Sequence, residues 1–208
     1  MKRKKTSNKY QTDHWAQKAK KENFPARSVY KLKEIQQKFK LINKGDKVLD
    51  LGCAPGSWAT YAASLVGKDG QVIGIDLKKT AHRFPANTHI IVGDVIELSE
   101  KDKENLDEMI GSGYAAVLSD MAPATTGRKD VDAARSYYLC MAALAIARKC
   151  LAPNGVFVCK IFQGDEFEEF KDAVCSSFSR HKIFKPQSCR KESKEIYIIG
   201  LGKKQEDI

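Results

Sequence analysis

The chain has 208 residues, of which 42% are hydrophobic and 30% are charged, a balance that excludes an intrinsically disordered protein and supports one hydrophobic core. Its 36 Lys and Arg residues exceed its 26 Asp and Glu residues, so a polyanion is the expected kind of partner. No run approaches the roughly 18 apolar residues of a membrane span, and the start, Met-Lys-Arg-Lys-Lys, lacks the apolar core of a secretory signal. We therefore expect a soluble cytoplasmic protein that does not bind membranes.

Apolar runs of strand length alternate with amphipathic runs of helix length, the pattern of a parallel sheet with helices on both faces. In chain order we expect helix 28–40, strand 47–51, helix 57–67, strands 71–76 and 89–93, helix 101–110, strand 114–119, helix 132–151, strand 155–161, helix 165–178, and strands 181–185 and 195–202. Ser28 is the expected cap of the first helix, and Pro153-Asn154-Gly155 is expected to turn the long helix into a strand.

The last two strands leave no room for a helix between them, so they must pair antiparallel. The sequence therefore predicts an α/β fold with a seven-stranded, mostly parallel sheet that ends in a C-terminal antiparallel pair.

The positive charge is concentrated at the N-terminus. Residues 1–33 hold eleven Lys and Arg residues against Asp13 and Glu22, whereas residues 34–208 hold 25 basic and 24 acidic residues. We therefore divide the chain into a basic arm, residues 1–27, that contacts a polyanion and a single domain, residues 28–208; the alternative is a merely solubilising tail. The aromatic residues near this end either stack on bases or dock the arm on the core: Tyr10, Trp15, Phe24 and Tyr30. A second basic cluster lies near the C-terminus: Arg180, Lys182, Lys185, Arg190, Lys191 and Lys194.

The cysteines do not form a metal site or a disulfide framework in this reading. No C-x-x-C pair occurs, and no His lies near a Cys at metal-ligand spacing. We expect reduced, mostly buried thiols at all six positions: Cys53, Cys140, Cys150, Cys159, Cys175 and Cys189.

Three predicted strands end in Gly or Asp residues. Gly52 and Gly56 follow the first strand and let the backbone pass close to a ligand, while the second and third strands end at Asp76 and Asp94. The first turn is neither G-x-G-x-x-G nor a Walker loop, so it does not indicate a phosphate cradle. Carboxylates at the carboxyl ends of parallel strands commonly meet ribose hydroxyls, so the pattern predicts a nucleoside-containing ligand.

Four segments resemble the FtsJ/RrmJ family of large-subunit ribosomal RNA 2′-O-ribose methyltransferases and occur in the same order as in that family. They are 50–58 (DLGCAPGSW), 119–123 (SDMAP), 158–164 (VCKIFQG) and 193–197 (SKEIY). The resemblance covers about residues 10–203. It implies a Rossmann-like methyltransferase fold with S-adenosyl-L-methionine as methyl donor. It also implies 2′-O-methylation of a uridine in the A-loop of large-subunit (23S-type) rRNA, on assembled or nearly assembled subunits.

The resemblance also implies a cofactor site made of Gly52, Pro55, Gly56, Trp58, Asp76, Asp94 and Asp120. In that site, Gly56 and Trp58 would line the methionine and sulfonium end. Asp76 would meet the adenosine ribose and Asp94 the adenine edge. Cys53 and Ser57 stand where the family often has Ala and Gly, and only local repacking is expected there.

The same resemblance implies a catalytic tetrad of Lys31, Asp120, Lys160 and Glu195. Taken alone, each has an ordinary structural alternative: a helix-surface lysine, a turn residue, a strand-end lysine that reaches solvent, and an edge-strand charge. Lys160 is the candidate general base. Desolvation and Lys31 favour a neutral amine that takes the 2′-hydroxyl proton, whereas Asp120 and Glu195 favour an ammonium that positions the hydroxyl and stabilises the developing alkoxide.

Segment 124–129 is rich in small and polar residues and is expected to be a mobile loop that closes over RNA; it departs from the Asn-containing version common in the family. Three other functions remain in view. They are the same chemistry on a tRNA or an mRNA cap, a non-catalytic ribosome assembly factor, and a small-molecule methyltransferase. We expect no metal and a monomer acting on large-subunit rRNA or the 50S-type subunit.

Overall fold

The computed structural model describes residues 13–190 and 192–205. Its elements are α1 (His14–Lys21), α2 (Val29–Phe39), β1 (Lys47–Leu51), α3 (Ser57–Val66), β2 (Gln71–Asp76), β3 (Thr88–Val92), α4 (Val95–Glu100), α5 (Lys103–Ile110), β4 (Tyr114–Ser119), α6 (Lys129–Cys150), β5 (Leu151–Phe162), α7 (Phe167–Ser177), β6 (Phe178–Phe184) and β7 (Glu195–Lys203). Tyr10 and Lys191, singled out above, lie outside the described residues.

The strands form one seven-stranded sheet in the order β3-β2-β1-β4-β5-β7-β6. Strands β1 to β5 run parallel, and β7 pairs antiparallel with both β5 and β6. The predicted fold class is therefore confirmed, including the antiparallel pair at the end. The strand order reverses between β1 and β4, and in open α/β sheets ligands bind at the carboxyl ends of the strands beside such a reversal.

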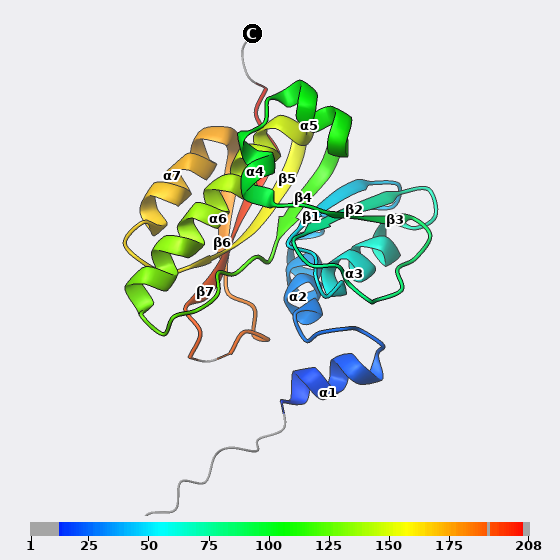
Figure 1. Cartoon of the computed structure of the whole chain (residues 1–208), viewed down its shortest axis with the longest axis horizontal. Coiled ribbons are helices and arrows are strands. Elements are labelled where there is room, and N and C mark those ends of the chain that lie inside the picture. The colour runs from blue at the N-terminus through cyan, green and yellow to red at the C-terminus, as the bar shows by residue number, and fades with distance from the viewer. Residues whose placement is uncertain (1–12, 191, 206–208) are drawn as a thin grey trace, which may run out of the picture.

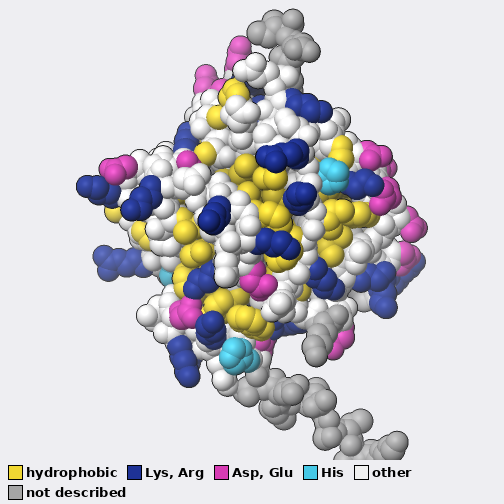
Figure 2. All heavy atoms as spheres, turned by 180° about the vertical axis from the view of Figure 1, so that it is seen from behind, with side chains coloured by type: hydrophobic (Ala, Val, Ile, Leu, Met, Phe, Trp, Pro, Cys, Tyr) yellow, Lys and Arg dark blue, Asp and Glu magenta, His cyan; other side chains and the backbone are white. Residues whose placement is uncertain are grey.

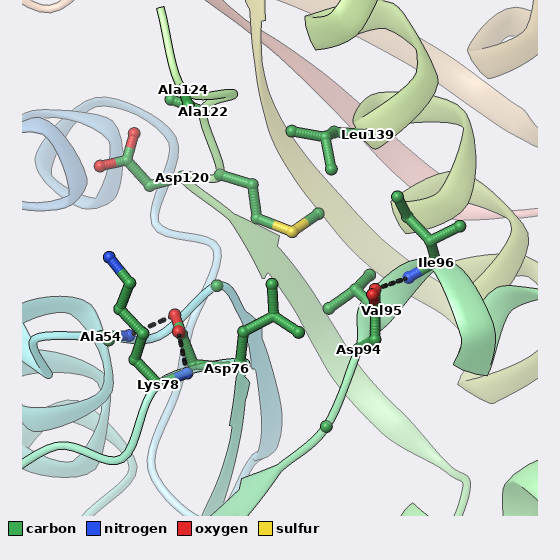
Figure 3. Close-up of a pocket in the computed structure, with 14 residues that line it drawn as sticks. Ala54, Asp76, Lys78, Asp94, Val95, Ile96, Asp120, Ala122, Ala124 and Leu139 are labelled. Atoms are coloured by element: carbon green, nitrogen blue, oxygen red, sulfur yellow. Dashed lines mark hydrogen bonds between the residues drawn. The ribbon is translucent and has the colours of Figure 1, made fainter.

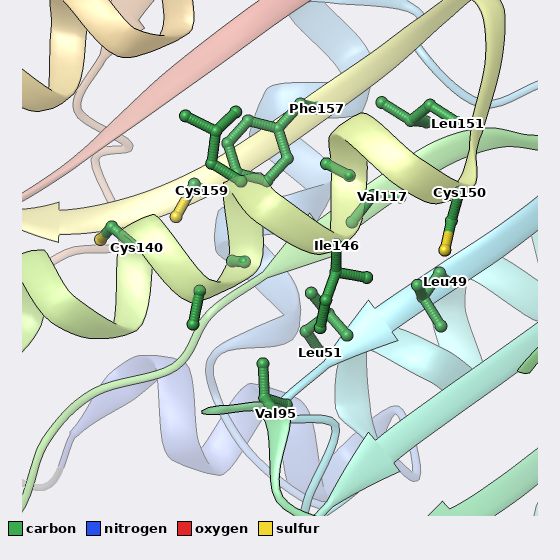
Figure 4. Packing of buried hydrophobic residues seen from close by; sticks show 14 of the residues in the cluster. Leu49, Leu51, Val95, Val117, Cys140, Ile146, Cys150, Leu151, Phe157 and Cys159 are labelled. Carbon is green, nitrogen blue, oxygen red and sulfur yellow. The ribbon is translucent and has the colours of Figure 1, made fainter. Parts of the chain in front are cut away.

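Helices cover both faces of the sheet (Figure 1). One core cluster packs α6 against β1, β4 and β5, with Leu51, Val117 and Phe157 almost fully buried (Figure 4). The other cluster packs α2 and α3 against the opposite face, including Leu32, Trp58 and Ile199. Viewed from behind, hydrophobic side chains reach the surface in the middle of the molecule, with Lys and Arg side chains among them (Figure 2). No helix in the described part of the chain is long and apolar enough to span a bilayer.

The structure contains two helices, α4 and α1, that the sequence analysis did not predict. The short α4 is capped by Asp94, whose side chain accepts a hydrogen bond from the backbone N–H of Ile96 at 2.8 Å. Helix α1 lies within the segment taken above as an arm. Asp13 caps α1, and Trp15, Ala19 and Phe24 pack with Tyr30 in a small separate core. For Trp15, Phe24 and Tyr30 the docking alternative therefore holds.

Several boundaries differ from the expectation, among them the start of β6 at Phe178 instead of residue 181. Helix α6 begins at Lys129 instead of residue 132, and β5 begins at Leu151, which pairs with Tyr114 before Asn154 turns the chain with a positive φ of 64°. Ser28 stands at the N-cap of α2 but has helical backbone angles and no side-chain capping bond. Its carbonyl instead accepts a hydrogen bond from the Trp58 ring at 2.8 Å.

Candidate active site

A cavity of about 450 Å³ opens at the carboxyl ends of the parallel strands, beside the reversal in strand order. Four of the expected cofactor residues line it: Gly52, Asp76, Asp94 and Asp120. Figure 3 shows that Asp76, Asp94 and Asp120 lie on different elements around one space, with Leu139 of α6 and Ile96 of α4 on one side of it. Leu77, 67% exposed, and Met121 add apolar surface. The cavity thus joins hydroxyl-binding carboxylates to an apolar wall of the kind that accepts a flat base.

Local hydrogen bonds fix the Asp76 carboxylate. It accepts from the backbone N–H of Ala54 at 2.9 Å and from that of Lys78 at 2.9 Å (Figure 3). The first bond ties the end of β2 to the glycine turn after β1, so the backbone of Ala54 and the Asp76 side chain border the cavity together.

Pro55, Gly56 and Trp58 do not line this cavity. Gly56 has a φ of 114°, and a Cβ there would lie 2.7 Å from the Phe84 ring, so the position requires glycine for packing against segment 82–84. Trp58 is 3% exposed and stacks on Tyr197 with ring centroids 5.9 Å apart. Pro55 is exposed, and its carbonyl accepts a hydrogen bond from Thr80 at 3.1 Å.

Ser57 and Cys53, the two departures from the family pattern, are both buried. The Ser57 hydroxyl accepts from the backbone N–H of Ala26 at 2.7 Å and donates to its carbonyl at 3.1 Å. This hydroxyl therefore fastens the start of α3 to the segment that leads into α2.

A second cavity, of about 540 Å³, lies on the other side of the segment that follows β4. Lys31, Lys160 and Glu195 line this second cavity, together with Arg27 and Arg190. Asp120 lines the first cavity, and Ala122 lines both. The four predicted catalytic residues therefore lie where the two cavities meet.

The four side chains form one network centred on Asp120. Its Oδ1 lies 3.0 Å from Nζ of Lys160 and 3.6 Å from Nζ of Lys31. Lys31 Nζ also donates to Glu195 Oε2 at 2.7 Å. Lys160 is only 5% exposed and donates a second hydrogen bond to the backbone carbonyl of Asp120. Lys160 is thus not a solvent-reaching strand-end lysine.

Burial and charge act against each other in this network. Burial would raise the pKa of Asp120, but Lys160 and Lys31 outweigh burial and hold that pKa below its usual value. Burial would lower the pKa of Lys31, but Asp120 and Glu195 raise it above its usual value. Asp120 and Lys31 are therefore both charged at neutral pH. The neighbouring Asp50 is 1% exposed, and burial together with the Asp120 charge raises its pKa to about 8, so Asp50 is mostly neutral at pH 7.

Tyr197 is part of the network although the sequence analysis gave it no role. Its hydroxyl donates to Asp120 Oδ1, and burial, followed by the Asp120 charge, raises the pKa of Tyr197 well above its usual value. The alternation of side chains along a strand could have identified Tyr197, because it lies two residues after Glu195 and so shares its face of β7. Trp58 supports this hydroxyl by stacking on the ring.

Segment 124–129, expected above as a mobile loop, is anchored by Asp132 of α6. Asp132 Oδ1 accepts from the backbone N–H of Thr126 at 2.7 Å, and Oδ2 accepts from that of Gly127 at 3.2 Å. Just before this anchor, Ala124 lines the first cavity and Thr125 the second. Asp132 therefore positions a segment that borders both cavities.

The loop between β6 and β7 is held against α2. Glu34 accepts from the backbone N–H groups of Gln187 at 2.6 Å and Ser188 at 2.9 Å, and Arg27 donates to the Ser188 carbonyl. Arg27 also pairs with Asp13 at the start of α1. Arg27 thereby connects α1, the second cavity and the loop that carries Arg190.

Within residues 13–190 and 192–205, no group of three or more His, Cys, Asp or Glu side chains is placed to hold a metal ion. The described cysteines are all free thiols.

Comparison with known proteins gives consistent family matches. Residues 24–203 match the FtsJ-like methyltransferase family. The chain is 60% identical over 192 residues to a protein of Desulforapulum autotrophicum named ribosomal RNA large subunit methyltransferase E, covering 92% of this chain and 93% of that relative. It is 52% identical over 205 residues to the protein of the same name in Desulfosudis oleivorans, covering 99% and 97%.

Solved structures share the fold. A structure described as a ribosomal RNA methyltransferase of Plasmodium falciparum aligns with a TM-score of 0.74 at 24% identity, covering 86% of this chain and 98% of that chain. Fibrillarin of Aeropyrum pernix, solved with S-adenosyl-L-methionine bound, aligns with a TM-score of 0.61 at 16% identity, covering 84% of this chain and 76% of that chain. At these identities the likeness extends to the fold alone.

Proposed function

The chain belongs to the FtsJ-like methyltransferase family, and we propose that it transfers a methyl group from S-adenosyl-L-methionine to a ribose 2′-hydroxyl of large-subunit ribosomal RNA. The observation that carries this proposal is the Lys31–Asp120–Lys160–Glu195 network at the junction of two cavities. One cavity suits a nucleoside-bearing donor, and the other, lined by Arg27 and Arg190, suits a phosphate-bearing acceptor.

The first cavity fits the proposed cofactor in the chemistry of its groups. Asp76 presents a fixed carboxylate for ribose hydroxyls, and Asp94 with Leu77 and Ile96 presents a carboxylate edge and apolar surface for a base. Gly52 and the tetrad residue Asp120 also line this cavity. When bound, S-adenosyl-L-methionine supplies a methyl group already activated on a sulfonium. Because Pro55, Gly56 and Trp58 lie outside this lining, we assign them to shaping the turn and supporting Tyr197.

Lys160 is the proposed general base. Its Nζ lies at the wall of the acceptor cavity and is held by Asp120, so in its neutral form it is positioned to receive the proton of the 2′-hydroxyl. Lys31, fixed by Glu195, places a positive charge beside the alkoxide that develops as the proton leaves. Alignment by these groups is the main task of the protein, because the donor carries its own activation.

We take the target to be a uridine of the A-loop in the assembled or nearly assembled subunit. The names of the relatives at 60% and 52% identity support large-subunit rRNA as the substrate class. Action on ribosomal subunits supports a cytoplasmic location. One chain supplies both cavities and all four catalytic residues, which supports action as a monomer.

The experiment that tests this function uses S-adenosyl-L-methionine with a labelled methyl group. Unmodified large subunits, protein-free large-subunit rRNA and tRNA are incubated with the wild type or Lys160→Ala, and modified nucleosides are identified by mass spectrometry. We expect 2′-O-methyluridine from the large subunit, absent with Lys160→Ala. Label in tRNA would overturn the substrate, and no label in any RNA with cofactor still bound would overturn the catalytic function.

We propose that the basic N-terminal arm contributes to RNA binding rather than to catalysis. Deleting residues 2–12, which carry five of the Lys and Arg residues, leaves the docked α1 in place. RNA affinity should fall by at least about tenfold at low salt, because phosphate contacts release counterions, and the salt dependence should become shallower. Cofactor affinity, measured by calorimetry, should stay unchanged. Equal RNA affinity of the deleted and intact chains would contradict the role of the arm.

A further inference from the structure

A third cavity lies at the end of the sheet opposite the tetrad. It has a volume of about 710 Å³ and is lined by Leu151 at the start of β5 and by Lys203 and Lys204 at the end of β7. Figure 1 shows this end, with α5 and the end of β7, at the top and α1 and α2 at the bottom. β4 runs from Tyr114 at this end to Ser119 beside Asp120, so about six residues at roughly 3.3 Å each separate the two sites by about 20 Å.

The lining of this cavity is strongly basic. Lys103, Arg148, Lys149, Lys203 and Lys204 line it, with Asp107 as the one carboxylate among the lining residues. Residues 34–208 as a whole carry only one excess positive charge. Four positive charges in excess around one cavity are therefore a local concentration in an otherwise balanced body.

Main-chain carbonyls, not carboxylates, hold most of these cations. Lys149 Nζ donates to the Ser99 carbonyl at 2.9 Å, near the end of α4, and Lys204 Nζ donates to the Cys175 carbonyl at 3.1 Å, near the end of α7. Arg148 donates to the hydroxyl of Ser177 at 2.7 Å. Within the described residues, Lys103, Arg148, Lys149 and Lys204 form no ion pair with a carboxylate.

Capping helix ends does not use up this charge. With Lys203 left aside, the other four cations exceed Asp107 by three charges. Each helix C-terminus carries about half a negative charge, so the ends of α4, α6 and α7 together offset about half of that excess. The side chains of Arg148, Lys149 and Lys204 are already ordered by their hydrogen bonds, so they lose little further entropy on binding an anion.

Lys103 has no such structural explanation. It is the first residue of α5, where the helix dipole disfavours a cation, and its exposed side chain makes no hydrogen bond or ion pair within the described part of the chain. Its charge therefore adds to the positive field of the cavity.

We propose that this cavity binds backbone phosphates of a second segment of the RNA substrate, away from the segment that carries the target ribose. That the ligand is RNA rests on the proposed function, whereas the preference for phosphate groups rests on the cations that line the cavity. Two contacts about 20 Å apart would fix the orientation of a large folded RNA on the enzyme, and phosphate contacts position a protein without reading sequence.

The test compares two double variants of the full chain, in which Glu206 and Asp207 remain present. Lys103→Ala/Lys204→Ala removes two cations of the cavity. The matched control Lys44→Ala/Lys68→Ala removes two exposed lysines outside this cavity whose side chains form no hydrogen bond or ion pair within the described residues. Binding of unmodified large-subunit rRNA is measured over a salt series without cofactor. The cavity variant should bind roughly tenfold more weakly at low salt, and the slope of log K against log salt should be less negative by about 2. The control should keep the wild-type slope.

Equal slopes for the two variants would overturn the proposal. A parallel titration with inorganic phosphate separates the two sources of phosphate. Sub-millimolar phosphate binding that disappears in the cavity variant, with an unchanged rRNA slope, would make this a site for a free anion and overturn the RNA assignment. Binding is measured apart from methyl transfer, so a slope change in a chain that methylates no RNA would contradict only the proposed function.

Discussion

Replacing Lys160 with Ala is expected to lower methyl transfer at least about 10³-fold while cofactor affinity stays unchanged. Lys160 Nζ is the group placed to take the proton at the acceptor cavity, and loss of a positioned base or of a charge beside the developing alkoxide has an effect of this size. Lys160 does not line the first cavity, so cofactor binding should survive. Single-turnover transfer and calorimetric titration of the cofactor measure the two quantities separately.

Lys160→Arg is the matched control because it separates the two roles open to Lys160. Arginine keeps the positive charge at every accessible pH but does not accept a proton. If Lys160 is the general base, Lys160→Arg should be as inactive as Lys160→Ala. Recovery of a tenth or more of wild-type transfer by Lys160→Arg would contradict the base assignment and favour an electrostatic role.

Replacing Asp120 with Asn is expected to destabilise the fold by about 3 kcal/mol at neutral pH and to abolish methyl transfer. Asp120 Oδ1 accepts a hydrogen bond from Tyr197 and forms ion pairs with Lys160 and Lys31, and breaking a buried ion pair leaves an uncompensated charge. Lys31 keeps Glu195 as a partner, whereas Lys160 loses its carboxylate. Urea unfolding followed by circular dichroism measures the change in the free energy of unfolding.

The same experiment carries a pH signature. The pKa of Asp120 is lowered in the folded state, so its contribution is complete above its unfolded pKa of about 3.9 and disappears as pH falls through the folded pKa. The pKa of Lys31 is raised, so its contribution is complete below an unfolded pKa of about 10.4 and disappears as pH rises through the folded pKa. The stability gap between wild type and Asp120→Asn should narrow below about pH 4. It should narrow again toward pH 8, because the variant lacks the Asp120 charge that helps to raise the pKa of Asp50. A gap that widens in acid would contradict this assignment.

The sequence was sufficient for the sheet and for the polar groups at its edge. Asp76, Asp94 and Asp120 follow three strands that run parallel, and parallel strands end at one edge, so local pattern implies that these residues meet. Hydrophobic alternation with short connections likewise implies the antiparallel pairing of β6 and β7.

The direction of side chains that face other elements could not be predicted in this way. Trp58 begins a helix beside the cofactor turn, but its ring points to Tyr197 of β7 and its N–H to Ser28, partners distant in sequence. Helix α1 is charge-rich, and its position depends on Trp15 packing against Tyr30. Neither contact follows from the hydrophobic periodicity of a single helix or strand.

The acceptor cavity is the least local feature of all. Its wall combines residues from the start of α2, the segment after β4, the end of β5 and the loop before β7. Family resemblance named Lys31, Lys160 and Glu195, whereas Arg27 and Tyr197 join the site through tertiary contacts to Ser188 and Asp120.

The shared wall at Ala122 has a thermodynamic consequence. If filling one cavity shifts this wall, the free energy of filling the other changes and the two binding equilibria are linked. Linkage is reciprocal, and the factor by which the methyl donor changes RNA affinity is the factor by which RNA changes donor affinity. Such a link would make donor and RNA bind as a coupled pair, and the departure of either product would then alter the affinity for the other.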